Sequence, residues 1–295
     1  MSLSASPPLT INSGCRELDV VWEEHIERAL SAAVLIPDTD EDLTWHAFLG
    51  HSLDMQGFRA AEFVGVDPLT KAAPKFRSLQ ARGIGVPELA ALWGIPALRE
   101  HLLTGCINTP FETTLGALKA AGHATGDSLA DALRWFPYVK SHWRVRAYLE
   151  NSTVLERHGF SFRRWLEAVC RSLGETRFPP PDFRLTVKVG KVETTLERAI
   201  RLRLEHDFYR VGPAIAAYMI ADWQLWLWRE GRTAVFDSYK QDAFHQAFVN
   251  TFGRGVVPVE QEAFTTWWSS RYPAIPVRLA NECIWLGVEL KTVKV

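Results

Sequence analysis

Apolar residues recur at intervals of three and four along most of the chain, the spacing of α-helices with one buried face. The clearest pattern is "SFRRWLEAVCRSLG" at 161–174, where four large apolar side chains share one face of the predicted helix: Phe162, Trp165, Leu166 and Val169. Residues 86–104 predict two short helices that are broken at Pro96 and end at Gly105. We therefore predict a mainly α-helical fold.

Another helix is predicted over 194–206, "TTLERAIRLRLEH". Its apolar positions form a stripe with helical spacing at Leu196, Ala199, Ile200 and Leu204. Thr194 and Glu197 have the spacing of a capping box, in which each side chain satisfies a free backbone amide at the start of a helix.

β-Structure is predicted to be little or absent. The proline run "RFPPPDF" at 177–183 breaks the helical pattern. After it, Leu185, Val187 and Val189 alternate with polar residues, which is the pattern of a strand. The same nine residues, 184–192, also suit an extended loop.

Charged residues are distributed unevenly along the chain. Residues 1–100 contain 8 Lys and Arg against 14 Asp and Glu, and the remaining residues contain 25 against 20. The later part of the chain therefore allows a surface for nucleic acid without requiring one. We predict three regions: an acidic helical region at 1–105, a helical barrel at 106–260, and C-terminal helices at 261–295 that pack back on the core.

Composition indicates a folded protein, since 47% of the residues are apolar and 12 Trp and 16 Phe are present. No apolar run reaches the roughly 18 residues of a membrane span, and the N-terminus does not resemble a signal peptide, so we expect a cytoplasmic protein without a membrane partner. The four cysteines are scattered, which argues against a zinc or iron–sulfur site.

A helical hairpin is predicted over 195–229. Its first helix ends near His206, the turn is "DFYRVG", and the second helix begins at Pro213, where a missing N–H costs little. Gly212 has no Cβ, so another backbone can approach it closely. The amides that follow at the helix N-terminus are donors for an anion such as a phosphate. The alternative is an ordinary helix–helix turn.

An acidic residue follows this hairpin at a distance. Asp237 stands twenty-five residues after Gly212, in "AVFDSYKQDAFHQAF", where we predict the start of another helix. Phe244 and Phe248 give that helix an apolar face, and Ser238 with Gln241 match a capping pair. Capping of the helix by Asp237 itself is the alternative to a catalytic role.

These residues resemble the helix-hairpin-helix DNA glycosylases, and "VGPAIAAYMIADWQ…AVFDSYK" is most similar to the alkylbase-type members. The match covers about 195–290, including "WWSSRYPAIPVRLANECIW", and loosely the helices from about 105. The resemblance implies a helical, two-lobed fold. It also implies a set of residues that bind the DNA backbone: Arg210, Val211, Gly212, Ala214 and Lys240.

Two departures from the family pattern affect the expected chemistry. The first glycine of the usual turn falls at Arg210, which predicts a wider hairpin. The lysine of the bifunctional members falls at Ala214. The resemblance therefore implies a monofunctional enzyme, which hydrolyses the base from the sugar without forming a Schiff base.

Glycosidic hydrolysis builds positive charge on the sugar, which a fixed carboxylate stabilises. Asp237 is the first candidate for this role, and Asp222, within the predicted second helix, is the alternative. An enzyme that flips a base out of DNA must hold it against aromatic or apolar walls. Such a pocket has four candidates, each of which also suits a core position: Trp223, Tyr239, Trp143 and Tyr138. Trp143 lies among basic residues, and this mixture suits either a strand-binding face or a solvated helix face.

The expected partner is DNA, bound by a monomer that needs no protein partner. We expect no cofactor, except that the hairpin could bind a monovalent cation. The substrate would be a damaged base or a modified one, such as a hypermodified phage base. Two other functions fit the same residues: an N-glycosidase for a small nucleoside or nucleotide, resembling the queuosine-salvage hydrolases, and a non-catalytic helix-hairpin-helix DNA-binding module.

Overall fold

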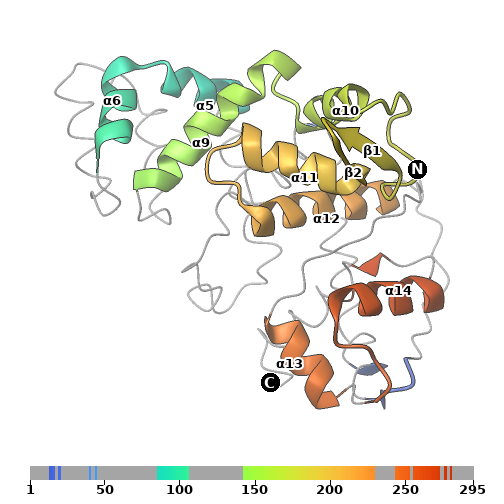
Figure 1. Cartoon of the computed structure of the whole chain (residues 1–295). Helices are drawn as coiled ribbons and strands as arrows, with labels where there is room; N and C mark the ends of the chain where they lie inside the picture. Colours follow the sequence, from blue (N-terminus) through green and yellow to red (C-terminus); the bar gives the residue numbers. More distant parts are fainter. Residues whose placement is uncertain are drawn as a thin grey trace, which may run out of the picture. The chain divides into compact units, whose positions relative to one another are not determined.

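A computed structural model of the chain describes residues 13–16, 19, 20, 40, 44, 85–105, 142–229, 243–252, 255–272, 276, 277 and 280. In this part of the chain the structure is mostly helical, with one two-stranded sheet (Figure 1). The chain divides into two compact units, which we call the central unit (35–223) and the terminal unit (1–34 and 224–295). The region boundaries at 105 and 260 stay predictions.

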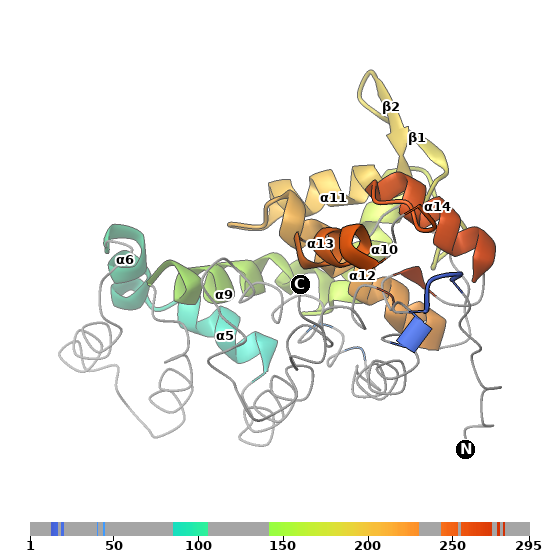
Figure 2. The same cartoon turned by 90° about the horizontal axis from the view of Figure 1, so that it is seen from below.

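Three helices form one side of the central unit: α5 (Val86–Trp93), α6 (Pro96–Thr104) and α9 (His142–Val154). The break predicted between the first two is confirmed, because α5 is followed by Gly94 and α6 begins with Pro96. The Glu88 carboxylate accepts a hydrogen bond from the Gly85 amide at 2.7 Å and so satisfies a donor at the start of α5. Both short helices pack against α9 (Figure 2).

A tight corner leads from the single-turn helix η4 (Glu156–His158) into α10 (Phe162–Ser172). Gly159 and Phe160 both adopt left-handed backbone angles there. The Ser161 hydroxyl caps α10 by accepting a hydrogen bond from the Arg164 amide. The apolar stripe predicted for this helix is confirmed, because its four members are buried: Phe162, Trp165, Leu166 and Val169.

Two short antiparallel strands follow the proline run: β1 (Thr186–Val189) and β2 (Val192–Thr195). We call this pair the ribbon. Its strands are joined by Gly190, at a φ of +63°, and Lys191. The strand interpretation of 184–192 is thus confirmed over part of its length, and this ribbon is the sheet that the described residues form.

The helix α11 (Leu196–Asp207) begins directly after the ribbon. Its N-cap is Thr195, whose hydroxyl accepts a hydrogen bond from the Arg198 amide at 3.3 Å. The predicted pairing of Thr194 with Glu197 is wrong, because Thr194 is still extended and pairs with Val187 in the ribbon. The buried stripe of α11 is confirmed at all four of its positions: Leu196, Ala199, Ile200 and Leu204.

The chain then reverses direction into α12 (Pro213–Arg229), which begins where the sequence predicts (Figure 1). Within the central unit, Trp223 of α12 is completely buried. The Phe178 ring stacks on its indole at 5.4 Å between centroids, and the Phe183 ring meets it edge-on at 5.0 Å. The proline run therefore covers part of the core.

The terminal unit contains α13 (Ala243–Phe252) and α14 (Gln261–Arg271), and the latter confirms the helix predicted in this segment. Aromatic rings cluster on and beside these two helices. The His245 ring meets the Phe264 ring edge-on, with 4.6 Å between centroids, and the ring centroids of Trp268 and Tyr272 are 4.7 Å apart. Near the N-terminus, the Asp19 carboxylate accepts hydrogen bonds from the amide and the hydroxyl of Ser13. Among the described helices, none has the length and apolar character that crossing a membrane requires.

Candidate nucleic-acid interface

Residues Phe208–Gly212 join α11 to α12, and we call them the hairpin turn. Arg210 at its apex is exposed and has a φ of +63°, in the left-handed region that few residues other than glycine adopt readily. The family pattern places a glycine at this position. The turn adopts the backbone conformation that suits a glycine there, although the residue present is an arginine.

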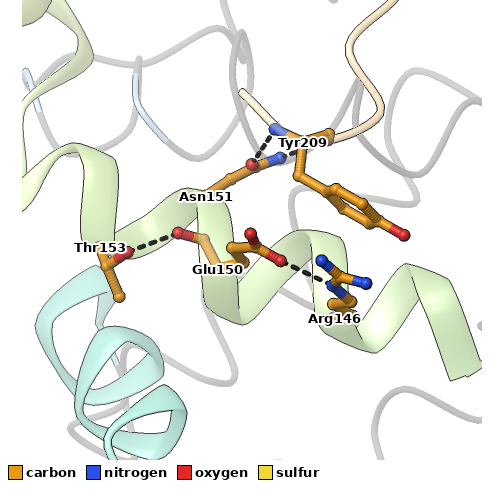
Figure 3. A network of polar contacts seen from close by, with 5 residues as sticks. All are labelled: Arg146, Glu150, Asn151, Thr153 and Tyr209. Carbon is orange, nitrogen blue, oxygen red and sulfur yellow. Dashed lines mark hydrogen bonds and ion pairs between the residues drawn. The ribbon is translucent and has the colours of Figure 1, made fainter. Parts of the chain in front are cut away.

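Asn151 of α9 binds the backbone of the hairpin turn (Figure 3). Its side-chain oxygen accepts a hydrogen bond from the Tyr209 N–H at 2.7 Å, and its side-chain nitrogen donates one to the Tyr209 carbonyl at 3.0 Å. The Asn151 side chain is completely buried, so both bonds are shielded from competing water. This carboxamide holds Tyr209, the residue immediately before Arg210, in place.

Arg146, five residues before Asn151 on α9, also contacts the hairpin turn. Its guanidinium lies 4.0 Å from the centre of the Tyr209 ring, within the range of a cation–π contact. Its Nε is 2.7 Å from a carboxylate oxygen of Glu150 (Figure 3). Arg146 is therefore engaged in supporting the hairpin turn. It belongs to the basic stretch around Trp143, for which the sequence allowed either a strand-binding face or a solvated helix face.

The start of α12 presents backbone donors. The first hydrogen bond of this helix runs from the Ala216 amide to the Gly212 carbonyl at 3.0 Å. Pro213 has no N–H, and the amides of Gly212, Ala214 and Ile215 donate to no acceptor in the part of the chain that the structure describes. A Cβ added at Gly212 would meet no described atom within 4 Å. Such a helix start can bind an anion.

The residues expected to bind the DNA backbone are placed unequally by the structure. Arg210 is exposed, and Gly212 and Ala214 are half-buried. Val211 is buried, with 4% of its surface exposed, so only its backbone could meet a ligand. Lys240 lies outside the described residues. The hairpin turn thus brings three of the five expected residues together near one surface.

The catalytic and base-pocket candidates are mostly beyond what the structure describes. Asp237, Tyr239 and Tyr138 lie outside the described residues. Asp222 falls within α12 and Trp143 within α9, and only their backbone positions are described. Their assignments stay predictions.

The structure corrects the assignment of Trp223 to a base pocket. We expected either a wall of a base pocket or a core residue, and the structure gives the core position. Its indole is completely buried and already packs against Phe178 and Phe183. A flipped base needs an accessible aromatic face to stack on, and this side chain offers none.

Asn151 and Tyr209 are the residues of the interface that the sequence analysis missed. One signal was present: Asn151 lies one helical turn after Ala147, on the buried side of α9. A buried carboxamide needs hydrogen-bond partners, so its position in an apolar stripe indicates a polar contact with another element. The sequence does not indicate which element, since the partner is 58 residues away.

Comparison with protein-family models, with curated proteins and with solved structures gave no match.

Proposed function

We propose that this protein binds DNA through the hairpin turn and acts as a monofunctional DNA N-glycosylase on a flipped damaged or modified base. The observation that carries the proposal is the start of α12, where three backbone amides and an unobstructed Gly212 follow an exposed Arg210. Contacts of this kind position a strand by its phosphates and do not read its sequence.

Binding by such a turn combines two forces. The amides of Gly212, Ala214 and Ile215 donate hydrogen bonds to phosphate oxygens, and the positive end of the α12 dipole favours the negative charge. The Arg210 guanidinium adds a charge-assisted contact. Asn151 fixes the backbone of the hairpin turn at Tyr209, so less conformational entropy is lost when the phosphate binds.

The chemical step is assigned to Asp237. As the bond between C1′ and the base nitrogen breaks, its electron pair leaves with the base and the sugar becomes positively charged. The carboxylate stabilises that charge and orients a water molecule, whose oxygen bonds to C1′ and whose proton passes through Asp237 toward the base. Ala214 occupies the position of the lysine in bifunctional enzymes, so the product is an intact strand with an abasic site.

The catalytic proposal is tested with duplexes that each contain one damaged or modified base. After incubation with the protein, hot alkali cleaves the strand only where an abasic site has formed. We expect cleavage with at least one base and its loss in Asp237→Asn. Asp222→Asn is the matched control, and it should retain activity. Full activity of Asp237→Asn would contradict the assignment.

The binding proposal is tested separately with Gly212→Ala. No described atom lies within 4 Å of the added methyl group, so the melting temperature should be almost unchanged, whereas approach of a phosphate would be obstructed. We expect weaker binding to a duplex and a binding constant that falls steeply with salt, because phosphate contacts release counterions. Salt-independent binding would point instead to a small nucleoside substrate. Binding without excision of any base would indicate the non-catalytic module.

A further inference from the structure

The ribbon has an apolar face that is exposed. Val189 is paired with Val192, and Val187 with Thr194, so these four side chains lie on one face. Val192 has 64% of its surface exposed and Val189 has 38%. Figure 2 shows the ribbon projecting away from the helices of the central unit. Two adjacent exposed valines at the tip form a small apolar patch that a ligand can cover.

Positive charge surrounds this apolar face. Lys188 lies on the opposite face, 3.5 Å from Glu193, and Lys191 is in the two-residue turn. Across 184–210, the exposed charged side chains include one acid, Glu193, and six bases: Arg184, Lys188, Lys191, Arg198, Arg203 and Arg210. Three of these bases form ion pairs with carboxylates, but exposed pairs of this type are weak and exchange readily for a phosphate.

The ribbon is joined to the hairpin turn through α11. The Leu196 amide donates to the Leu185 carbonyl at 2.8 Å, and the Glu197 amide donates to the Phe183 carbonyl at 2.9 Å. β2 then continues into α11, whose other end is the hairpin turn. Four strand residues and twelve helical residues span at most about 30 Å, which corresponds to about nine base pairs of a duplex.

We propose that the tip of the ribbon is a second DNA contact, which lies in a groove of the same duplex that the hairpin turn binds. Lys188 and Lys191 contact phosphates, and Val189 and Val192 contact the groove. A two-stranded ribbon fits the major groove of B-DNA. The excess of positive charge favours DNA over a second copy of this chain, and the short link through α11 allows both contacts to meet one duplex. This inference rests on the proposed function.

The test measures binding of fluorescent stem-loop DNAs with stems of about 6 and about 20 base pairs, below and above the estimated span. Lys188→Ala/Lys191→Ala should weaken binding of the long stem on the order of tenfold and reduce the slope of log affinity against log salt by about 1.8. Binding of the short stem should hardly change. Arg157→Ala/Arg171→Ala, which removes two exposed arginines from η4 and α10, is the matched control and should behave as the wild type.

A second variant tests the apolar contact. Val192→Ser keeps the charge of the ribbon and should weaken binding of the long stem without affecting the salt slope. Wild-type affinity and salt slope in both ribbon variants, with weakened binding in Gly212→Ala, would overturn the ribbon contact and leave the proposed function intact. A wild-type protein that binds neither stem would overturn both. A dimer that dissociates in Val192→Ser, with DNA affinity unchanged, would show that a second copy covers the ribbon.

Discussion

Two corners of the central unit have the same backbone feature but different surroundings. The first leads from η4 into α10, and the second is the hairpin turn that leads from α11 into α12. Each contains a residue other than glycine in the left-handed region, with a φ of +58° at Phe160 and +63° at Arg210. Each is followed by the N-terminus of a helix, which carries backbone amides without partners inside that helix.

At the first corner, protein groups satisfy these amides. The Arg164 amide donates to the Ser161 hydroxyl and the Phe162 amide donates to the Thr44 hydroxyl, both at 3.0 Å. The Ser161 hydroxyl in turn donates to a carboxylate oxygen of Asp40 at 2.6 Å. At the second corner, no side chain of the described residues caps α12, and the closest polar support, from Asn151, is directed at Tyr209. The first corner is thus closed by contacts within the protein, and the second has donors available for a ligand.

The largest effect is expected from Asn151→Ala. The change leaves the partly buried N–H and carbonyl of Tyr209 without their partner, which should lower the free energy of unfolding by about 1–2 kcal/mol. DNA affinity should also fall, because the hairpin turn is no longer fixed. Chemical denaturation and fluorescence anisotropy measure the two effects. Thr153→Ala, on the same helix, should leave DNA affinity unchanged, and equal loss of affinity in both variants would refute a specific role for Asn151.

Ser161→Ala should have a smaller effect that is confined to stability. It removes the N-cap of α10, so the free energy of unfolding should fall by about 1 kcal/mol. DNA affinity should stay at the wild-type value, since this corner has its donors satisfied internally. If this variant reduces DNA binding as strongly as Gly212→Ala does, the distinction between the two corners is wrong.

Arg210→Gly should separate backbone conformation from charge at the hairpin turn. Glycine adopts the left-handed region without steric cost, although it loses more entropy than arginine on folding. The free energy of unfolding should therefore rise by about 0.5 kcal/mol. The lost guanidinium should weaken DNA binding and lower the salt slope by about 0.9. Arg210→Lys, which keeps the charge, should retain the slope. A glycine variant that is less stable than the wild type would contradict the assigned backbone conformation.

The smallest effect concerns pH. Burial lowers the pKa of His158, beside the first corner, against the opposing attraction of Asp207. The unfolded chain therefore binds this proton more readily, so stability should decrease as pH falls through the ordinary histidine pKa of about 6.5. His158→Gln should reduce this pH dependence, as measured by denaturation between about pH 5 and 8. An unchanged pH profile would exclude a contribution from His158.

Local patterns predicted the helices of the described residues well, but contacts between distant segments changed their details. Helical spacing predicted the buried stripe of α10. The spacing and Pro213 also predicted the two ends of the hairpin turn to within a few residues. The cap of α11 was misplaced by one residue because pairing of Thr194 with Val187 prolongs the extended backbone. The sequence alone does not show whether Trp223 belongs to a core or to a base pocket. The packing of Phe178 and Phe183 against its indole shows that it belongs to the core.

By itself, the sequence determined most of the described helices to within a few residues, and it determined that the chain turns at Gly212 and Pro213. Tertiary structure decided which polar groups are already satisfied: Asn151 reaches Tyr209 across 58 residues, and Arg146 packs on the Tyr209 ring. The reason is physical. Helical periodicity and turn preferences depend on neighbours within a few residues, whereas a hydrogen-bond partner or the cover over an aromatic ring depends on how distant segments pack.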